Sequence, residues 1–220
     1  MDWFPLLNSL RIAALSSLLV FFLGIAAAYY IAKLPPTAKG VLDAVLTLPL
    51  VLPPTVVGYL LLLALGPRRP LGALLLSAWG VRLVMQWQAA VLAVSVVVFP
   101  LMYRTARGAL EGVDESLADA GRTLGLSEAY IFWRIRLPCC KHGILAGAVL
   151  AFARALGEYG ATSMVAGYIP GRTATISTEV YQLWRTGEDG PALRWVLVNL
   201  LISAAVLLAI NLLERRERRR

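Results

Sequence analysis

Two charged residues interrupt an apolar stretch in the second half of the chain. Arg154 and Glu158 stand four positions apart in the run AFARALGEYGAT. On a helix this spacing places both side chains on one face, and charges in an apolar segment are costly unless they pair or face water. The two residues therefore form either a structural ion pair or a gate or anion route, in which Arg154 supplies positive potential.

A second feature is the proline-rich run LPLVLPPTVVGYLLLLAL, which contains Pro53, Pro54 and Gly58. Each proline removes a backbone donor and clashes with the preceding helical turn. The sequence therefore predicts a helix that kinks or opens here. Either packing tolerates the kink, or irregular backbone lines a pathway, because freed carbonyls at membrane depth need protein or water beside them.

Neither feature predicts catalysis. A phosphate-binding GxxxxGK[ST] loop is absent, since none of the three lysines follows a glycine. Cys139, Cys140 and His142 lack the spacing of a metal site, and no nucleophile stands with a base. A membrane-embedded enzyme would need more polar groups than Arg154 and Glu158 with a nearby threonine. We expect no enzyme activity, no metal and no cofactor in this chain.

The elements that carry these residues are membrane helices. The 220-residue chain is 59% hydrophobic and 15% charged, with a mean hydropathy of +0.70, and few soluble proteins have such a composition. The first apolar run is too long for a secretory signal, and Asp2 stands where such signals carry positive charge. Apolar runs long enough, or nearly so, to cross a bilayer as helices occupy residues 6–32, 41–66, 86–103, 143–163 and 195–213.

Basic residues orient the five predicted spans. With the N-terminus outside and the C-terminus in the cytoplasm, thirteen lysines and arginines fall inside and six outside, as the positive-inside rule requires. The dense basic tail at 215–220 is interpreted as a cytoplasmic stop signal that touches anionic lipid, not as a nucleic-acid site. The stretch LGALLLSAW within residues 67–85 is too short to cross, but leaves a sixth span open.

Residues 116–138, SLADAGRTLGLSEAYIFWRIRLP, form the longest segment without a membrane-grade apolar run. Ser116 with Asp119 three positions later predicts an N-terminal capping box. A small apolar face follows with helical spacing, and it consists of Leu117, Ala120, Gly121 and Leu124. The pattern predicts a short amphipathic helix on the cytoplasmic side.

A second short helix is predicted after this one. Gly125 takes the left-handed conformation that ends the first helix, and Ser127 caps the second. Pro138 forces the chain out of the second helix and into the next span. Two short helices at a sharp turn either lie on the lipid surface or present a small-residue face to another protein.

The spacing of this segment resembles the EAA signature of bacterial ABC importer permeases, whose loop docks on the ATPase subunit. Asp replaces Glu and Gly replaces the second Ala of that signature. The residues that the signature would use for coupling are Asp119, Ala120, Gly121, Leu124, Gly125, Ile135, Leu137 and Pro138. The phrases LDAVLTLPLVLPPTVVGYLLLLALG and LAFARALGEYGATSMVAGYIPGRTATIS further resemble the permease subunit of molybdate ABC transporters, with tungstate and sulfate permeases as close relatives.

This resemblance implies a single all-α transmembrane permease domain over residues 1–220, with a cytoplasmic coupling segment at about 114–138. It implies a homodimer in the cytoplasmic membrane of a bacterium or archaeon, and two separate ATPase subunits that bind ATP and Mg²⁺. A periplasmic or extracellular oxyanion-binding protein would deliver the cargo to a pathway or gate near Pro53, Pro54, Gly58, Arg154 and Glu158. A secondary transporter or channel remains the alternative class, although it would usually show internal repeats.

Overall fold

The computed structural model describes residues 2–217, and all regular elements among them are helices. They follow in the order α1 (Phe4–Ala32), α2 (Pro36–Val51), α3 (Pro54–Leu65), α4 (Pro70–Trp79), α5 (Trp87–Glu111), α6 (Glu115–Thr123), α7 (Glu128–Ile131), the π-helix η1 (Phe132–Arg136), α8 (Leu137–Leu156), α9 (Gly160–Val165), α10 (Ile176–Arg185) and α11 (Asp189–Glu217). The end of the predicted basic tail, residues 218–220, lies outside the described residues.

Four helical stretches in the described part of the chain are long and apolar enough to cross a membrane. They are α1, α5, the combined stretch Glu128–Leu156, and α11. The pair α2 and α3 passes the same test together, but it bends by 112° and is either one broken span or a re-entrant loop. The predicted five spans agree with the structure if this pair is one broken span. Residues 67–85 contain only the ten-residue α4, which is too short to be a sixth full span.

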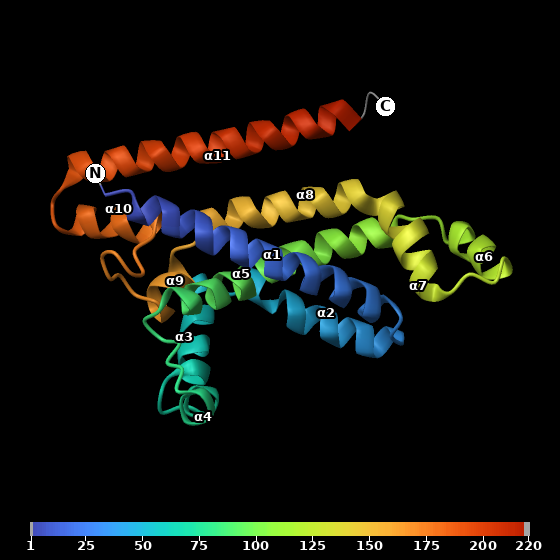
Figure 1. Cartoon of the computed structure of the whole chain (residues 1–220), viewed down its shortest axis with the longest axis horizontal. Coiled ribbons are helices and arrows are strands. Elements are labelled where there is room, and N and C mark those ends of the chain that lie inside the picture. Colours follow the sequence, from blue (N-terminus) through green and yellow to red (C-terminus); the bar gives the residue numbers. More distant parts are fainter. Residues whose placement is uncertain (1, 218–220) are drawn as a thin grey trace.

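The long helices lie along one axis of the molecule (Figure 1). The N-terminal end of α1 lies at one end of this axis, and α6, α7 and the last turns of α11 lie at the other. The first residues and the segment 116–138 are thus at opposite ends, as the predicted arrangement of crossings requires.

Helix α5 is the centre of the bundle, because α1, α2, α8 and α9 all pack on it. Small residues allow this close approach: Ala89, Ala90 and Ala93 of α5 are fully buried. A Cβ on Gly24 of α1 would stand 2.9 Å from Cγ of Met102. Helices in a membrane associate mainly through such close packing, because lipid tails are as apolar as the side chains.

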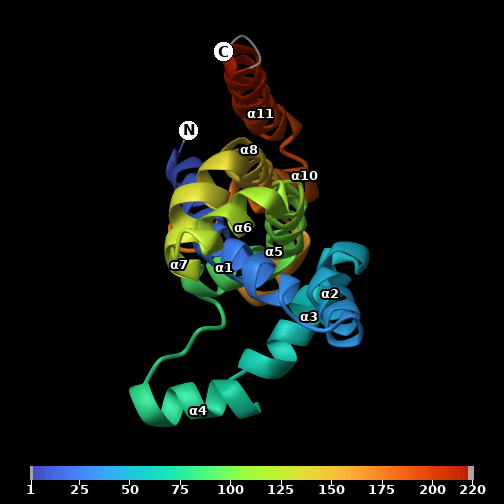
Figure 2. The same cartoon turned by 90° about the vertical axis from the view of Figure 1, so that its right-hand side faces the viewer.

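Two elements stand apart from this bundle. Figure 2 shows α4 projecting on one side and α11 on the other. Only 11% of the apolar window of α11 is buried, and Leu200 and Leu201 are more than half exposed. A helix that is apolar all round and uncovered in one chain is covered in the membrane by lipid or protein.

The fourth span differs from its prediction. Residues 143–163 were expected to form it, but the helix begins at Glu128, runs through η1, and ends at Leu156. The prediction that Pro138 ends a separate short helix is wrong. The reason is the π-helix directly before it, in which the Leu137 N–H bonds the carbonyl of Phe132. Its wider turn brings the chain to Pro138 as the second residue of α8, a position that tolerates proline.

Candidate functional site

The coupling segment begins with a cap that the sequence analysis assigned wrongly. Asp114, not Ser116, is the N-cap of α6, and its carboxylate accepts a hydrogen bond from the Ser116 N–H at 2.9 Å. This bond lowers the pKa of the Asp114 carboxyl. Asp119 does not close a capping box but pairs with Arg122 at 2.6 Å. Helix α6 therefore starts at Glu115, before Ser116, because the short acceptor side chain of Asp114 already caps its first turn.

The predicted apolar face of α6 is divided between two sides. Gly121 is buried, and a Cβ there would lie 3.1 Å from Ile131 and 3.2 Å from Ile135. Leu117 and Leu124 are instead exposed, by 45% and 78%. Gly121 therefore seats α6 on its own chain, and the exposed leucines remain for another surface.

The predictions for the turn after α6 are confirmed. Gly125 has φ +74, a left-handed conformation that glycine adopts without steric cost. Its N–H bonds the carbonyl of Arg122 at 2.9 Å, and the next N–H, of Leu126, bonds Gly121 at 3.1 Å. Ser127 then caps α7 by accepting the N–H of Tyr130 at 3.2 Å.

Ion pairs fold the coupling segment back onto the long fourth span. Arg122 contacts Glu128 at 2.7 Å and Glu115 at 3.4 Å, and Glu115 also contacts Arg136. The bond to Glu128 is the main cause that raises the pKa of Arg122. Each pair is exposed and individually weak, but together they restrain α6 relative to α7 and η1.

The remaining signature residues lie where the segment joins the span. Ile135 and Leu137 are half-buried, Ile135 against Gly121 and Leu137 against the core. Pro138 and Ala120 are exposed. The structure thus gathers the predicted coupling residues at one end of the bundle. Some pack against the rest of the chain, Gly125 forms the turn, and the others are exposed.

At the second predicted site, the span 41–66 is broken as the prolines predict. Helix α2 ends at Val51, the backbone of Leu52 and Pro53 is extended, and α3 starts at Pro54. Helix α3 then packs closely against α9. A Cβ on Gly58 would lie 2.9 Å from the Cα of Ala161, so only glycine permits this crossing.

Arg154 and Glu158 form the ion pair that their spacing predicts, with Nη1 to Oε2 at 2.8 Å. The prediction that one helix carries both is wrong, because α8 ends at Leu156 and Glu158 follows Gly157. The second carboxylate oxygen of Glu158 accepts the N–H of Ala161 at 2.9 Å. Its side chain is 1% exposed and that of Arg154 41%. Glu158 therefore joins the end of α8 to α9.

The structure brings the two parts of the predicted pathway together. Gly160, next to Ala161 in α9, lies against the start of α3: its Cβ would stand 3.1 Å from the amide nitrogen of Thr55. The proline break, Gly58 and Glu158 thus meet through α9. Sequence reasoning missed Gly160 and Ala161, because nothing in the sequence separates α9 from α8 except Gly157.

A charged cluster between α2 and α5 was also missed. The Tyr103 hydroxyl donates to the Asp43 carboxylate, which also contacts Arg107. Glu111 accepts from Arg107 at 2.9 Å and from Lys39 at 3.0 Å. The signal in the sequence is the spacing of four between Tyr103, Arg107 and Glu111, which puts them on one face of α5.

At the opposite end, buried polar groups tie α1 to the loop before α10. Asn8 donates to the carbonyl of Ala174 at 2.9 Å, and Ser9 accepts the N–H of Ile176 at 2.9 Å. In the same loop, burial and a hydrogen bond to Glu179 raise the pKa of Tyr168 to about 12. Arg172 of this loop is exposed.

The described residues contain no group of three or more His, Cys, Asp or Glu side chains placed to hold a metal ion. The two cysteines are free, with Cys139 exposed and Cys140 buried. The contacts described above at these sites are packing, hydrogen bonds and ion pairs.

Most of the chain matches a family of known proteins. The sequence profile of the family "Binding-protein-dependent transport system inner membrane component" matches residues 21–219. The molybdenum transport system permease protein ModB of Escherichia coli K12 is 43% identical over 221 residues, which cover 100% of this chain and 96% of that protein. ModB of Haemophilus influenzae is 40% identical over 209 residues, covering 94% of this chain and 91% of that protein.

Solved structures share the fold. A chain of the inward-facing MetNI methionine ABC transporter matches with a TM-score of 0.74 at 16% identity, covering 96% of this chain and 94% of that one. A chain of a bacterial alginate ABC transporter, solved with its pentasaccharide-bound periplasmic protein, matches with a TM-score of 0.75 at 21% identity, covering 95% and 76%. The predicted all-α bundle of the importer permease type is confirmed.

Proposed function

The chain belongs to the family of binding-protein-dependent transport system inner membrane components, and we propose that the oxyanion it carries is molybdate. It is a multi-pass membrane permease subunit of an ABC importer, in which a separate subunit hydrolyses ATP, so it is not itself an enzyme. Its partners are an ATPase and a binding protein. The observation that supports molybdate is the 43% identity to a molybdenum permease along the whole chain.

The proposed assembly is a homodimer with two ATPase subunits, in the cytoplasmic membrane of a bacterium or archaeon. The described part of one chain offers five crossings at most and leaves α11 largely uncovered, which a second copy around a two-fold axis would remedy. The basic residues favour a cytoplasmic position for α6 and an outer position for the loop with Arg172. An oxyanion-binding protein would dock at that outer end.

Coupling in this proposal runs through one continuous helix. The stretch Glu128–Leu156 has 29 residues and is therefore about 43 Å long. Helix α6 is seated on its first turns through Gly121, and Glu158 joins its far end to α9. When an ATPase pulls α6, the helix moves as a rod and shifts α9 against the broken span, so that inward-open and outward-open states alternate.

The pathway is proposed to pass beside the proline break and Gly58, where α3 meets α9. Arg154 is the proposed source of positive potential for the oxyanion. Its exposed guanidinium is neutralised by Glu158 at rest, so its attraction for an anion depends on how far the pair opens during transport.

The test is uptake into liposomes that contain the permease with its ATPase, supplied with the binding protein. We expect labelled molybdate to enter only with ATP, and unlabelled molybdate to compete more strongly than sulfate. Equal or stronger competition by sulfate or tungstate would contradict molybdate as the transported oxyanion, but the chain would still be the permease of an ATP-driven importer. Uptake without ATP would instead favour a secondary transporter or channel.

A further inference from the structure

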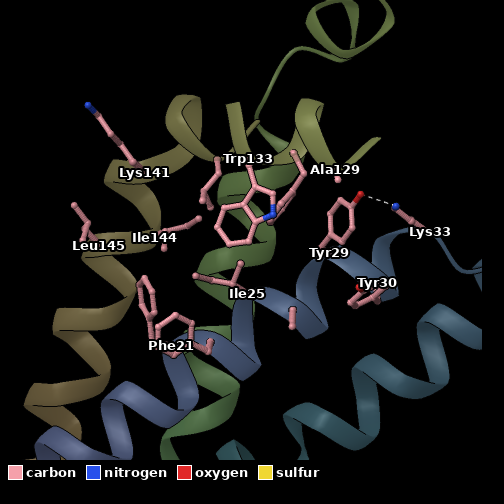
Figure 3. Close-up of a pocket in the computed structure, with 14 residues that line it drawn as sticks. Phe21, Ile25, Tyr29, Tyr30, Lys33, Ala129, Trp133, Lys141, Ile144 and Leu145 are labelled. Atoms are coloured by element: carbon pink, nitrogen blue, oxygen red, sulfur yellow. Dashed lines mark hydrogen bonds between the residues drawn. The ribbon is translucent and has the colours of Figure 1, made fainter. Parts of the chain in front are cut away.

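We propose that a cavity between α1 and the stretch α7–η1–α8 binds one anionic phospholipid of the leaflet on the side of α6. The cavity has a volume of about 690 Å³ and is shown in Figure 3. The proposal depends on the chain lying in a bilayer and not on the identity of the transported oxyanion.

The surface of the cavity matches a lipid chain. Of its fourteen lining residues, ten are apolar, and the others are two tyrosines and two lysines. In Figure 3 Ile25 lies below the Trp133 ring and Phe21 lies lower still, while Ile144 lies to the side, level with Trp133. Trp133 and Phe22 are 63% and 61% exposed, so the cavity is open to the lipid phase.

The positive charges at the rim of the cavity favour an anionic headgroup. Lys33 and Lys141 line the cavity from α1 and α8, on opposite sides in Figure 3, and no acidic residue lines it. The Lys33 ammonium donates to the Tyr29 hydroxyl at 2.7 Å and lies 3.9 Å from the centre of that ring. Lys33 is thus held at the rim just after α1, where Glu128 also lies near enough for the two charges to interact. Lys141, on the opposite side of the rim, is therefore the ammonium that a headgroup phosphate would neutralise.

The dimensions agree with one leaflet. Phe21 and Lys33 are twelve residues apart on α1, a distance of about 18 Å along a helix. Half of a bilayer's hydrocarbon core is about 15 Å thick. With the lysines at the headgroup level, where such side chains reach toward the polar interface, an acyl chain would extend to the level of Phe21.

A second copy of the chain is a poorer occupant. The exposed helix α11 is the obvious candidate from a neighbouring copy, but residues 190–213 contain no acidic residue. Its insertion would bring no counter-charge to Lys141 and would surround this lysine with apolar side chains, which is costly. Lys141 therefore favours lipid over this helix.

The cavity lies beside the start of η1, where the coupling segment continues into the long fourth span. The rings of Tyr29 and Phe132 lie 4.3 Å apart between their centres, and Phe132 is the first residue of η1. Both residues line the cavity. An acyl chain packed there would fill the space beside this contact and hold α1 against the start of the long fourth span.

The experiment uses the complete permease–ATPase complex in nanodiscs of equal parts phosphatidylglycerol and phosphatidylcholine with identical acyl chains. Native mass spectrometry of the released complex counts the lipids that stay bound. We expect phosphatidylglycerol to be retained in preference to phosphatidylcholine. Lys141→Gln should weaken its retention about fivefold, whereas Lys39→Gln, which removes the same charge outside the cavity, should leave retention unchanged.

Three results would overturn the proposal. Equal retention of the two lipids would show that the charge of the headgroup does not matter. Equal losses of phosphatidylglycerol in the two variants would show that the cavity is not the binding site. A disulfide between Leu145→Cys in one copy and a cysteine placed in α11 of another would show that protein fills the cavity. Failure of molybdate uptake would leave this lipid measurement unaffected, so the two proposals are tested separately.

Discussion

The guanidinium of Arg154 lies 2.8 Å from the carboxylate of Glu158, across the turn at which α8 ends. Because Glu158 also accepts the N–H of Ala161, one buried carboxylate holds the end of the long fourth span and the start of α9. Helix α9 in turn packs on α3. The pair is therefore a mechanical link as well as a charge balance.

Replacing Glu158 should separate these two roles. Glu158→Ala removes both bonds and is expected to cost about 1.5–3 kcal/mol, a fall of about 5 °C in the melting temperature of the detergent-purified protein. Glu158→Gln keeps an oxygen for Ala161 and should lose less. Equal losses in the two variants would mean that the charge, and not the cap of α9, supplies the stability.

Arg154→Ala should lower molybdate uptake and substrate-coupled ATPase activity together, because the pathway would lose its proposed positive potential. The control is Arg82→Ala, an exposed arginine outside the spans. Unchanged uptake and ATPase activity in Arg154→Ala would remove this residue from the pathway.

Gly58→Val should force α3 away from α9, since its first added atom would already stand 2.8 Å from Cβ of Met164. We expect a loss of about 1–3 kcal/mol and slower uptake, measured by thermal unfolding and by transport in liposomes. Gly40→Ala is the control, because a Cβ on that helical glycine meets nothing within 4 Å. If the control falls as far as Gly58→Val, general helix effects and not the crossing would explain the loss.

Gly125→Val should disturb only the coupling segment. A β-branched residue at φ +74 costs about 1–2 kcal/mol, so the turn between α6 and α7 would rearrange while the spans stay folded. The expected result is reduced co-purification of the ATPase or ATP hydrolysis that no longer drives uptake. Gly125→Asn, which tolerates the left-handed conformation, should retain most of the coupling, and normal behaviour of the valine variant would contradict the assignment.

Tyr103→Phe tests the charged cluster between α2 and α5. The hydroxyl is fully buried and donates to Asp43, so its removal is expected to cost about 1–3 kcal/mol. Tyr59→Phe, at an exposed tyrosine of α3, should be neutral. The free energy of unfolding in detergent with added denaturant measures both, and a neutral Tyr103→Phe would show that Arg107 alone secures Asp43.

Local rules predicted much of this structure from the sequence. Proline chemistry gave the break before Pro54, glycine gave the left-handed turn at Gly125, and Ser127 gave the start of α7. Each of these depends on backbone constraints within a few residues. Hydropathy located the four long apolar helices, since each span must satisfy its own backbone hydrogen bonds.

The errors arose where neighbours decide the outcome. Helical periodicity put Leu124 and Gly121 on one face, but packing against Ile131 buried the glycine and left the leucine exposed. Proline rules ended a helix at Pro138, where a π-turn carried it through. The joint role of Glu158 in α8 and α9 needed the position of Ala161, which residue spacing alone does not give.

The π-helix at Phe132–Arg136 sets the angular register between the two functional ends of the molecule. A π-turn holds one residue more than an α-turn does, and one residue corresponds to about 100° of rotation about a helix axis. If the same residues formed ordinary α-helix, α6 would therefore swing about a quarter-turn around α8, whereas deleting one residue there would restore ordinary helix and keep its direction. The direction in which the proposed coupling helix points, relative to the proposed pathway at the far end, thus depends on this turn staying π-helical.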